Sequence, residues 1–305
     1  MSWTARSIPD QSGRTAVVTG ANSGIGFVAA RELARRGARV VLACRSEERG
    51  AAAMERLLSQ VPEAQAELRT LDLADLSSVQ RFTDALPCER VHLLLNNAGL
   101  MAVPYARTAD GFETQFGVNH LGHFALTGLL LERLLAAPGA RVVTVSSMAH
   151  MLSNIDMNDL NSERRYRPML AYGASKTANL LFVREFAHRA DAKGLDLTVA
   201  AVHPGYSSTE LQVKGHQLAG RPLRERLARL TNAAVASSPD QGAAPTLFAA
   251  TAPYVHGDSF FGPRILGVRG GPGPSRRASW ARNDIAAGQL WAASERLTGV
   301  TYRGL

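Results

Sequence analysis

A tyrosine and a lysine four positions apart, Tyr172 and Lys176, have the types and spacing for acid–base chemistry. The residues that follow, 177–186, have an amphipathic helical pattern, and residues four apart share one face of a helix. A nearby ammonium favours the phenolate and lowers the pKa of the phenol, which could then exchange protons near neutral pH. Only three of the 34 lysines and arginines are lysines, which suggests that arginine would not serve here. Alone, however, such a pair is more often a surface tyrosine beside a solvated lysine, because the spacing is common by chance.

A glycine-rich loop near the N-terminus has the spacing Gly20-x-x-x-Gly24-x-Gly26, between a predicted strand at 14–19 and a predicted helix at 24–36. Glycines allow a tight turn and a close approach of phosphate, while the helix N-terminus supplies free N–H groups. This strand–loop–helix context favours a dinucleotide site over an ordinary turn. The candidate cofactor-binding residues of the loop are Gly20, Asn22, Ser23, Gly24, Ile25 and Gly26.

The second predicted strand ends at Cys44 and Arg45. An acidic residue here would hydrogen-bond the adenosine ribose and select NAD(H). Arg45 can instead pair with a 2′-phosphate, so we expect NADP(H) as the cofactor in preference to NAD(H). The alternative is that Arg45 is one more surface arginine.

Short apolar runs alternate with helical patterns along the chain. Continuous Val/Leu runs indicate strands buried on both faces, and their alternation with helices indicates a parallel sheet covered on both sides. We therefore expect an α/β Rossmann fold, a single doubly wound parallel sheet of about seven strands with helices on both faces. The expected strands cover 14–19, 39–44, 66–71, 91–96, 141–146, 195–202 and 259–261, and the expected helices 24–36, 47–59, 75–85, 111–135 and 172–190.

Polar groups follow three further strands, at Asp72, at Asn97 and at the serine pair Ser146 and Ser147. The carboxyl ends of parallel strands are where open α/β sheets place their sites. We expect these groups to lie beside the glycine loop.

Taken in this order, the motifs resemble the short-chain dehydrogenase/reductase family over residues 14–261. A closer likeness is to retinol-dehydrogenase-like members. It rests on the segments GANSGIG (20–26), ACR (43–45), TADGFE (108–113), VNHLGHF (118–124), SSMAH (146–150) and AVHPG (201–205).

The resemblance implies four catalytic roles. Tyr172 would be the general acid for carbonyl reduction and the base for alcohol oxidation, and Lys176 would lower its pKa and hold the nicotinamide ribose. Ser147, which the family pattern favours over Ser146, would hydrogen-bond the substrate oxygen as charge develops on it. Asn119 would hold a water molecule in a proton relay.

The resemblance also implies further cofactor contacts. Asp72 would hold the adenine and Leu73 would supply the next backbone contact, while the hydroxyl of Thr209 could bond the carboxamide. The remaining implied contacts come from Asn97, Ala98, Gly99, Tyr172, Lys176, Pro204 and Gly205.

We interpret residues 1–305 as one NADP(H)-binding domain with three attachments. The segment 148–170 is rich in methionine and apolar residues, so it is expected to form a loop over a bulky, apolar small-molecule substrate, or else to be a packed surface loop. The segment 206–237 is expected to be a helical lid, and the Pro/Gly/Arg-rich tail 263–305 to be irregular.

The function expected from these residues is an NADP(H)-dependent oxidoreductase that interconverts a carbonyl and an alcohol. A reductase of carbon–carbon double bonds could use the same tyrosine and lysine. A non-catalytic dinucleotide-binding regulator is disfavoured, because such proteins typically lose the tyrosine or the lysine.

Composition narrows the partners and the compartment. The net charge of +8 comes mostly from scattered arginines without a nucleic-acid-binding motif, so no nucleic-acid partner is expected. Residues 1–13 are polar and no apolar run reaches the roughly 18 residues of a membrane span, so neither a secretory signal nor a spanning helix is expected. Two cysteines, Cys44 and Cys88, fit a reduced, cytoplasmic setting.

Three histidines, His120, His123 and His150, could suggest a metal. No carboxylate or cysteine cluster joins them in the sequence, so we expect them to be structural and expect no metal site. The resemblance further implies a homodimer or homotetramer formed through the helices at 111–135 and 172–190.

Overall fold

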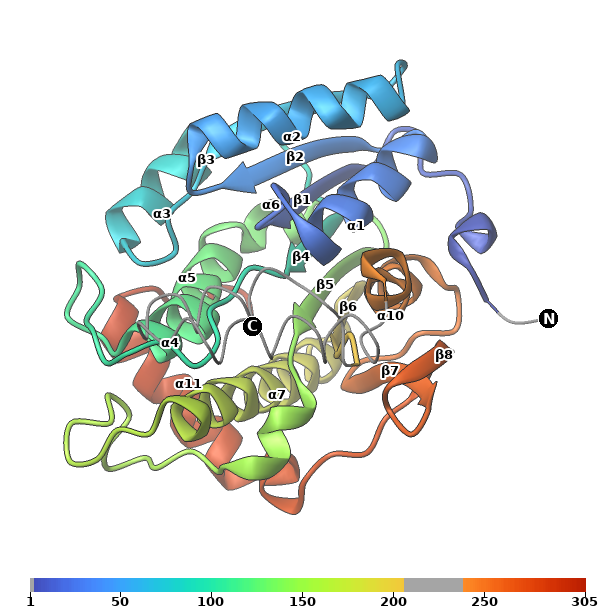
Figure 1. The fold of residues 1–305 in the computed structure, drawn as a ribbon. Coiled ribbons are helices and arrows are strands. Elements are labelled where there is room, and N and C mark those ends of the chain that lie inside the picture. Colours follow the sequence, from blue (N-terminus) through green and yellow to red (C-terminus); the bar gives the residue numbers. More distant parts are fainter. Residues whose placement is uncertain (1–2, 206–237) are drawn as a thin grey trace, which may run out of the picture.

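Eight strands form one sheet through the middle of the molecule (Figure 1). This computed structural model describes residues 3–205 and 238–305. The strand order is β3-β2-β1-β4-β5-β6-β7-β8; the first seven strands pair in parallel, and β8 pairs antiparallel with β7. The predicted α/β doubly wound sheet is confirmed, with eight strands where seven were expected.

The elements follow one another as the apolar runs predict. The strands are β1 (Thr15–Thr19), β2 (Arg39–Cys44), β3 (Ala66–Thr70), β4 (Leu93–Asn96), β5 (Ala140–Val145), β6 (Leu197–Val202), β7 (Ser259–Ile265) and β8 (Arg269–Pro274). The helices are α1 (Gly24–Arg35), α2 (Glu47–Gln60), α3 (Leu76–Asp84), α4 (Thr114–Phe116), α5 (Gly122–Leu129), α6 (Leu131–Leu135), α7 (Pro168–Ala192), α10 (Pro239–Thr251) and α11 (Asp284–Thr298).

Alternate side chains of each central strand enter two different cores. In β1, Val17 faces a core formed with α3, α5, α6 and α7, whereas Ala16 and Val18 face a core formed with α1, α2 and α10. Figure 1 shows these two helical layers on the two sides of the sheet. Burial on both faces explains why the strand sequences are continuous Val/Leu runs.

The helix expected at 111–135 is broken into pieces. The first piece, α4, begins at Thr114, three residues later than expected. Its N-cap is Glu113, whose carboxylate accepts hydrogen bonds from Gln115 N and Phe116 N, both at 2.8 Å. A π-helical turn, Gly117–Leu121, then joins α4 to α5 and contains Asn119. Such turns are often found at functional sites.

The expectation of an irregular tail at 263–305 is wrong. After β7 the chain turns back as β8, and α11 follows. The sequence of β8, RGGPGP, has no strand propensity of its own; it becomes a strand because the edge of β7 supplies its hydrogen bonds. Helix α11 is capped by Asn283, whose side chain accepts a hydrogen bond from Ala286 N at 3.1 Å, and by the left-handed Gly299.

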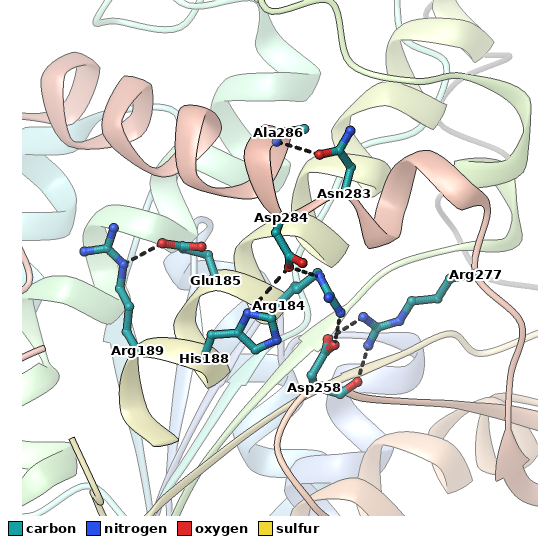
Figure 2. A network of polar contacts seen from close by, with 9 residues as sticks. All are labelled: Arg184, Glu185, His188, Arg189, Asp258, Arg277, Asn283, Asp284 and Ala286. Atoms are coloured by element: carbon teal, nitrogen blue, oxygen red, sulfur yellow. Dashed lines mark hydrogen bonds and ion pairs between the residues drawn. The ribbon is translucent and has the colours of Figure 1, made fainter. Parts of the chain in front are cut away.

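Helix α11 packs against α7 (Figure 1). The Trp291 ring stacks on Phe182 at 5.8 Å and packs near Phe186 at 5.9 Å. At the start of α11, Asp284 accepts a 2.6 Å hydrogen bond from Arg184 of α7 (Figure 2). Helix α11 thus covers part of the α7 surface that the resemblance assigns to a second copy, and the expected homodimer or homotetramer stays a prediction.

None of the helices in residues 3–205 and 238–305 is both long and apolar enough to cross a bilayer.

Candidate active site

A cavity of about 640 Å³ lies at the carboxyl ends of the central strands. Ser147 lines this cavity, and so does every predicted cofactor-binding residue that the structure describes. The cofactor-binding residues are Gly20, Asn22, Ser23, Gly24, Ile25, Gly26, Arg45, Asp72, Leu73, Asn97, Ala98, Gly99, Tyr172, Lys176, Pro204 and Gly205. Thr209 and the expected lid at 206–237 lie outside the described residues. The sheet therefore brings together side chains that are far apart in the sequence.

The glycine loop is held against the end of β4. The Thr19 hydroxyl oxygen accepts hydrogen bonds from Asn97 N and Ala98 N, both at 2.9 Å, and Asn97 Nδ2 donates to Thr19 O at 2.8 Å. A Cβ atom on Gly26 would lie 2.5 Å from Asn97 Nδ2 and from Gly20 O, so only glycine fits there. The glycine spacing thus serves close packing as well as the approach of a phosphate.

Tyr172 is buried in α7 and hydrogen-bonds Ser147 through its side chain. Burial raises the pKa of Tyr172, and the hydrogen bond with Ser147 opposes this rise. The direction is opposite to the one expected from the Tyr–Lys spacing, because loss of water around the phenol disfavours the phenolate. Lys176 Nζ lies 5.7 Å from the centre of the Tyr172 ring.

Lys176 is also buried, 3% exposed, and its Nζ atom donates a 3.0 Å hydrogen bond to Val145 O at the end of β5. Burial lowers the pKa of Lys176 to about 7. The ammonium and the neutral amine of Lys176 are therefore both populated near neutral pH.

The two serines at the end of β5 have different surroundings. Ser146 is buried, and its hydroxyl donates a 2.8 Å hydrogen bond to Lys176 O, a main-chain contact between β5 and α7. The Ser147 hydroxyl lies at the cavity, where it accepts a 3.2 Å hydrogen bond from Ala149 N and bonds the phenol of Tyr172. This geometry favours Ser147 for contact with a substrate.

Asn119 is fully buried and is not among the described residues that line the cavity. Its Oδ1 atom accepts from Leu100 N at 2.7 Å, and its Nδ2 atom donates to Leu100 O and to Ser175 Oγ, both at 2.9 Å. Its nearness to Lys176 is evident at Gly99, where a Cβ atom would lie 3.0 Å from Asn119 Oδ1 and 3.4 Å from Lys176 Nζ. The side chain thus holds the loop after β4 against α7, and its expected role with a water molecule stays a prediction.

Comparison with known proteins now decides the family. The family model described as short chain dehydrogenase matches residues 14–217. The chain belongs to the short-chain dehydrogenase/reductase family. It is therefore an oxidoreductase acting on CH–OH groups with NAD(P), of the retinol-dehydrogenase-like branch.

Several relatives match nearly the whole chain. Retinol dehydrogenase 12 of Mus musculus is 42% identical over 295 residues, which are 95% of this chain and 88% of that protein. Retinol dehydrogenase 13 of Homo sapiens is 40% identical over 298 residues, covering 94% of this chain and 85% of that protein. The crystal structure of an uncharacterised protein from Mycobacterium paratuberculosis matches with a TM-score of 0.83 and 48% identity, over 99% of both chains. The RhlG/NADP active-site complex of Pseudomonas aeruginosa matches with a TM-score of 0.62 and 25% identity, over 81% of this chain and 93% of that one.

In this short-chain dehydrogenase/reductase, Arg45 has two polar neighbours in the cavity wall that were not predicted from the sequence. Ser46 and Arg49, from the start of α2, line the same part of the chain's cavity wall. Arg49 lies in the first turn of α2, where its main-chain N donates a 3.2 Å hydrogen bond to the hydroxyl of the N-cap residue Ser46. Cys44 is buried, and burial raises the pKa of its thiol to about 11, so the thiol is neutral.

Another part of the cavity wall is apolar and is called here the apolar end. Leu152, Met169 and Leu266 line it from three separate elements and are 59%, 43% and 91% exposed. Leu266 lies in the turn between β7 and β8, in the part of the chain expected to be irregular tail. Leu152 and Met169 both belong to the predicted substrate loop at 148–170, but the contribution of Leu266 depends on a hairpin that the sequence pattern did not indicate.

The three histidines noted in the sequence are buried in separate contacts. His120 Nε2 lies 2.8 Å from Ser294 Oγ, and His123 bridges Asn119 O at 3.1 Å and Thr19 Oγ1 at 2.9 Å. Burial lowers the pKa of His120 and of His123 to about 3, so both are neutral. Within the described residues no three His, Cys, Asp or Glu side chains are grouped as a metal ion would require.

Proposed function

We propose that this protein is an NADP(H)-dependent oxidoreductase that interconverts an apolar carbonyl compound and its alcohol. The observation that carries the proposal is the shared cavity: Ser147 and Tyr172 line it together with the glycine loop, Arg45 and the apolar end. One site can then hold a dinucleotide and a small molecule together.

The cavity fits a dinucleotide in size and in chemistry. Its volume of about 640 Å³ is in the range of cofactor sites. The N-terminus of α1 lies on its wall at Gly24, Ile25 and Gly26, where free N–H groups attract phosphate. When bound, the nicotinamide supplies the hydride.

The 2′-phosphate of NADP(H) is best matched by the end of the cavity near β2. Arg45 and Arg49 supply two guanidinium groups there, and the residue at the end of β2 is a neutral cysteine instead of a carboxylate. The NADP in the related RhlG complex supports the same choice.

The phenol of Tyr172 is suited to donate a proton to the carbonyl oxygen of the substrate. Its raised pKa keeps it protonated at neutral pH, which is the form needed for reduction. The Ser147 hydroxyl would hydrogen-bond the same oxygen as negative charge develops on it. Lys176 would hold ribose hydroxyls and, below pH about 7, add a positive charge. Asn119 would keep the loop after β4 in place beside Lys176.

The apolar end of the cavity favours a substrate with a large hydrocarbon part. Leu152, Met169 and Leu266 are exposed apolar side chains that a hydrocarbon would cover. The relatives named retinol dehydrogenases support an apolar alcohol or aldehyde.

The proposal is tested with a panel of aldehydes, ketones and alcohols, followed by NADPH absorbance and by product analysis. We expect reduction of apolar carbonyls and a loss of turnover of about 10²–10⁴-fold in Tyr172→Phe, the range for a missing general acid. Equal turnover by this variant would refute the role of Tyr172. If the product is instead a compound with its carbon–carbon double bond reduced and its carbonyl intact, the protein is a double-bond reductase and the proposed reaction is wrong.

A further inference from the structure

His150 lies at the junction of the active site and the C-terminal segment. It is fully buried, two residues beyond the cavity-lining Met148, and both of its ring nitrogens are engaged. Nδ1 lies 2.6 Å from Ser147 O, and Nε2 accepts a 3.2 Å hydrogen bond from Ala278 N. The imidazole therefore bridges the backbone of Ser147 and the segment between β8 and α11.

One protonation state of His150 satisfies all of these contacts. Ala278 N can only donate, so Nε2 must be the acceptor, and Nδ1 must carry the proton that it donates to Ser147 O. Burial lowers the pKa of His150, in keeping with this neutral ring. The ring also packs edge-on against Phe260 of β7, with 5.6 Å between the ring centres.

The far end of this bridge is itself anchored. Arg277, directly before Ala278, forms an ion pair with the Asp258 carboxylate and donates to Asp258 O at 2.5 Å. Asp258 also accepts from Arg184 of α7 at 2.7 Å, so the segment is tied to the catalytic helix (Figure 2). Ala278 N is thus held at a set position from which it meets His150.

The main chain of His150 adds two further bonds at the same place. Its carbonyl oxygen accepts from Thr177 Oγ1 in α7 and from Trp280 Nε1 in the C-terminal segment, both at 3.2 Å. Thr177 is the neighbour of Lys176, so the turn after Ser147, the helix of Tyr172 and the C-terminal segment all meet at one residue.

We propose that His150 is a positioning residue, which fixes the Ser147 backbone against the C-terminal segment and thereby aims the Ser147 hydroxyl at the substrate oxygen. The inference rests on the proposed role of Ser147. It gives the C-terminal segment a part in catalysis, although none of that segment's residues between 275 and 305 lines the cavity.

Three substitutions separate the two ends of the bridge. In His150→Asn the amide nitrogen can replace Nδ1 and still donate to Ser147 O. In His150→Gln the longer side chain can reach only toward Ala278. His150→Phe keeps a ring but makes neither hydrogen bond. We expect kcat to fall about tenfold to a hundredfold in the Phe and Gln variants, with the KM for NADPH unchanged, and to stay within about threefold of wild type in the Asn variant. Losses of kcat that simply follow the loss of thermal stability across the three variants would overturn the proposal, as would full activity of His150→Phe.

A double substitution and a control keep the test specific. If His150 acts through Ser147, adding His150→Phe to Ser147→Ala should cause no further loss of kcat, whereas independent structural damage would multiply the two losses. Glu185→Gln weakens the Glu185–Arg189 contact on the same helix in Figure 2 without touching His150 or the Arg184–Asp258–Arg277 anchor, so its kcat should equal that of wild type. A fully active Ser147→Ala enzyme would refute the role of Ser147 and with it the role of His150, whereas the proposed function would fail only if no carbonyl or alcohol of the substrate panel reacted. An inactive Ser147→Ala beside an unaffected His150→Phe would refute only the role of His150.

Discussion

Lys176 Nζ donates its hydrogen bond to the carbonyl oxygen of Val145, the last residue of β5, at 3.0 Å. A main-chain carbonyl offsets only part of the hydration that the ammonium loses on burial, and the pKa of Lys176 falls to about 7. Burial of Lys176 thus lowers the free energy of unfolding, although the residue is expected to act in catalysis.

Replacing this lysine should therefore stabilise the protein while removing its activity. Between pH about 7 and 10.5 the unfolded chain binds a proton at this position that the folded chain does not, so the wild-type free energy of unfolding rises with pH across this window. Lys176→Met removes this dependence and should be more stable at pH 7 by an amount on the order of a few kcal/mol. Urea unfolding of both proteins at several pH values measures the difference, and a gap that does not shrink toward pH about 10 would contradict the expectation.

The raised pKa of Tyr172 predicts a different pH dependence for the two directions of reaction. Carbonyl reduction needs the protonated phenol, which persists at neutral pH, whereas alcohol oxidation needs the phenolate. We expect kcat for oxidation to increase with pH up to at least about 9, while reduction is already supported at pH about 7. Initial rates in both directions over this range test it, and an oxidation rate that is flat with pH would be inconsistent with Tyr172 as the base.

The choice of cofactor should depend on the end of β2. Arg45→Ala is expected to raise the KM for NADPH about tenfold to a hundredfold, the value of a charge-assisted hydrogen bond, and to leave the KM for NADH nearly unchanged. Adding Cys44→Asp should shift preference further toward NADH, because a carboxylate would bind the ribose hydroxyl. Unchanged selectivity between NADPH and NADH in the double variant would show that the 2′-phosphate does not bind at this end of the cavity.

The turn between β7 and β8 offers a matched pair for testing the apolar end. Leu266 lines the cavity, whereas its neighbour Ile265 is 62% exposed and is not among the lining residues. Leu266→Ala should lower kcat/KM about tenfold for a carbonyl with a long hydrocarbon chain and little for a short one. Ile265→Ala should change neither value; equal effects of the two variants would show that Leu266 does not contact the substrate.

The parts of this molecule that the sequence could predict are those built from local patterns. Val/Leu runs marked the central strands, and the glycine loop, Ser147 and Tyr172 all reached the cavity wall because each follows a strand or lies on a predicted helix. The eighth strand could not be predicted, since its glycines and prolines form a strand only beside β7. The rise in the pKa of Tyr172 could not be predicted either, because it depends on how completely the fold removes water from the phenol.

The last helix has a consequence for how the protein behaves in solution. Because α11 belongs to the same chain as the helix it covers, Phe182 and Phe186 find their cover, Trp291, without any encounter between molecules. A chain cut before residue 284 would instead bare these rings, so the same surface would become a site of self-association upon proteolysis.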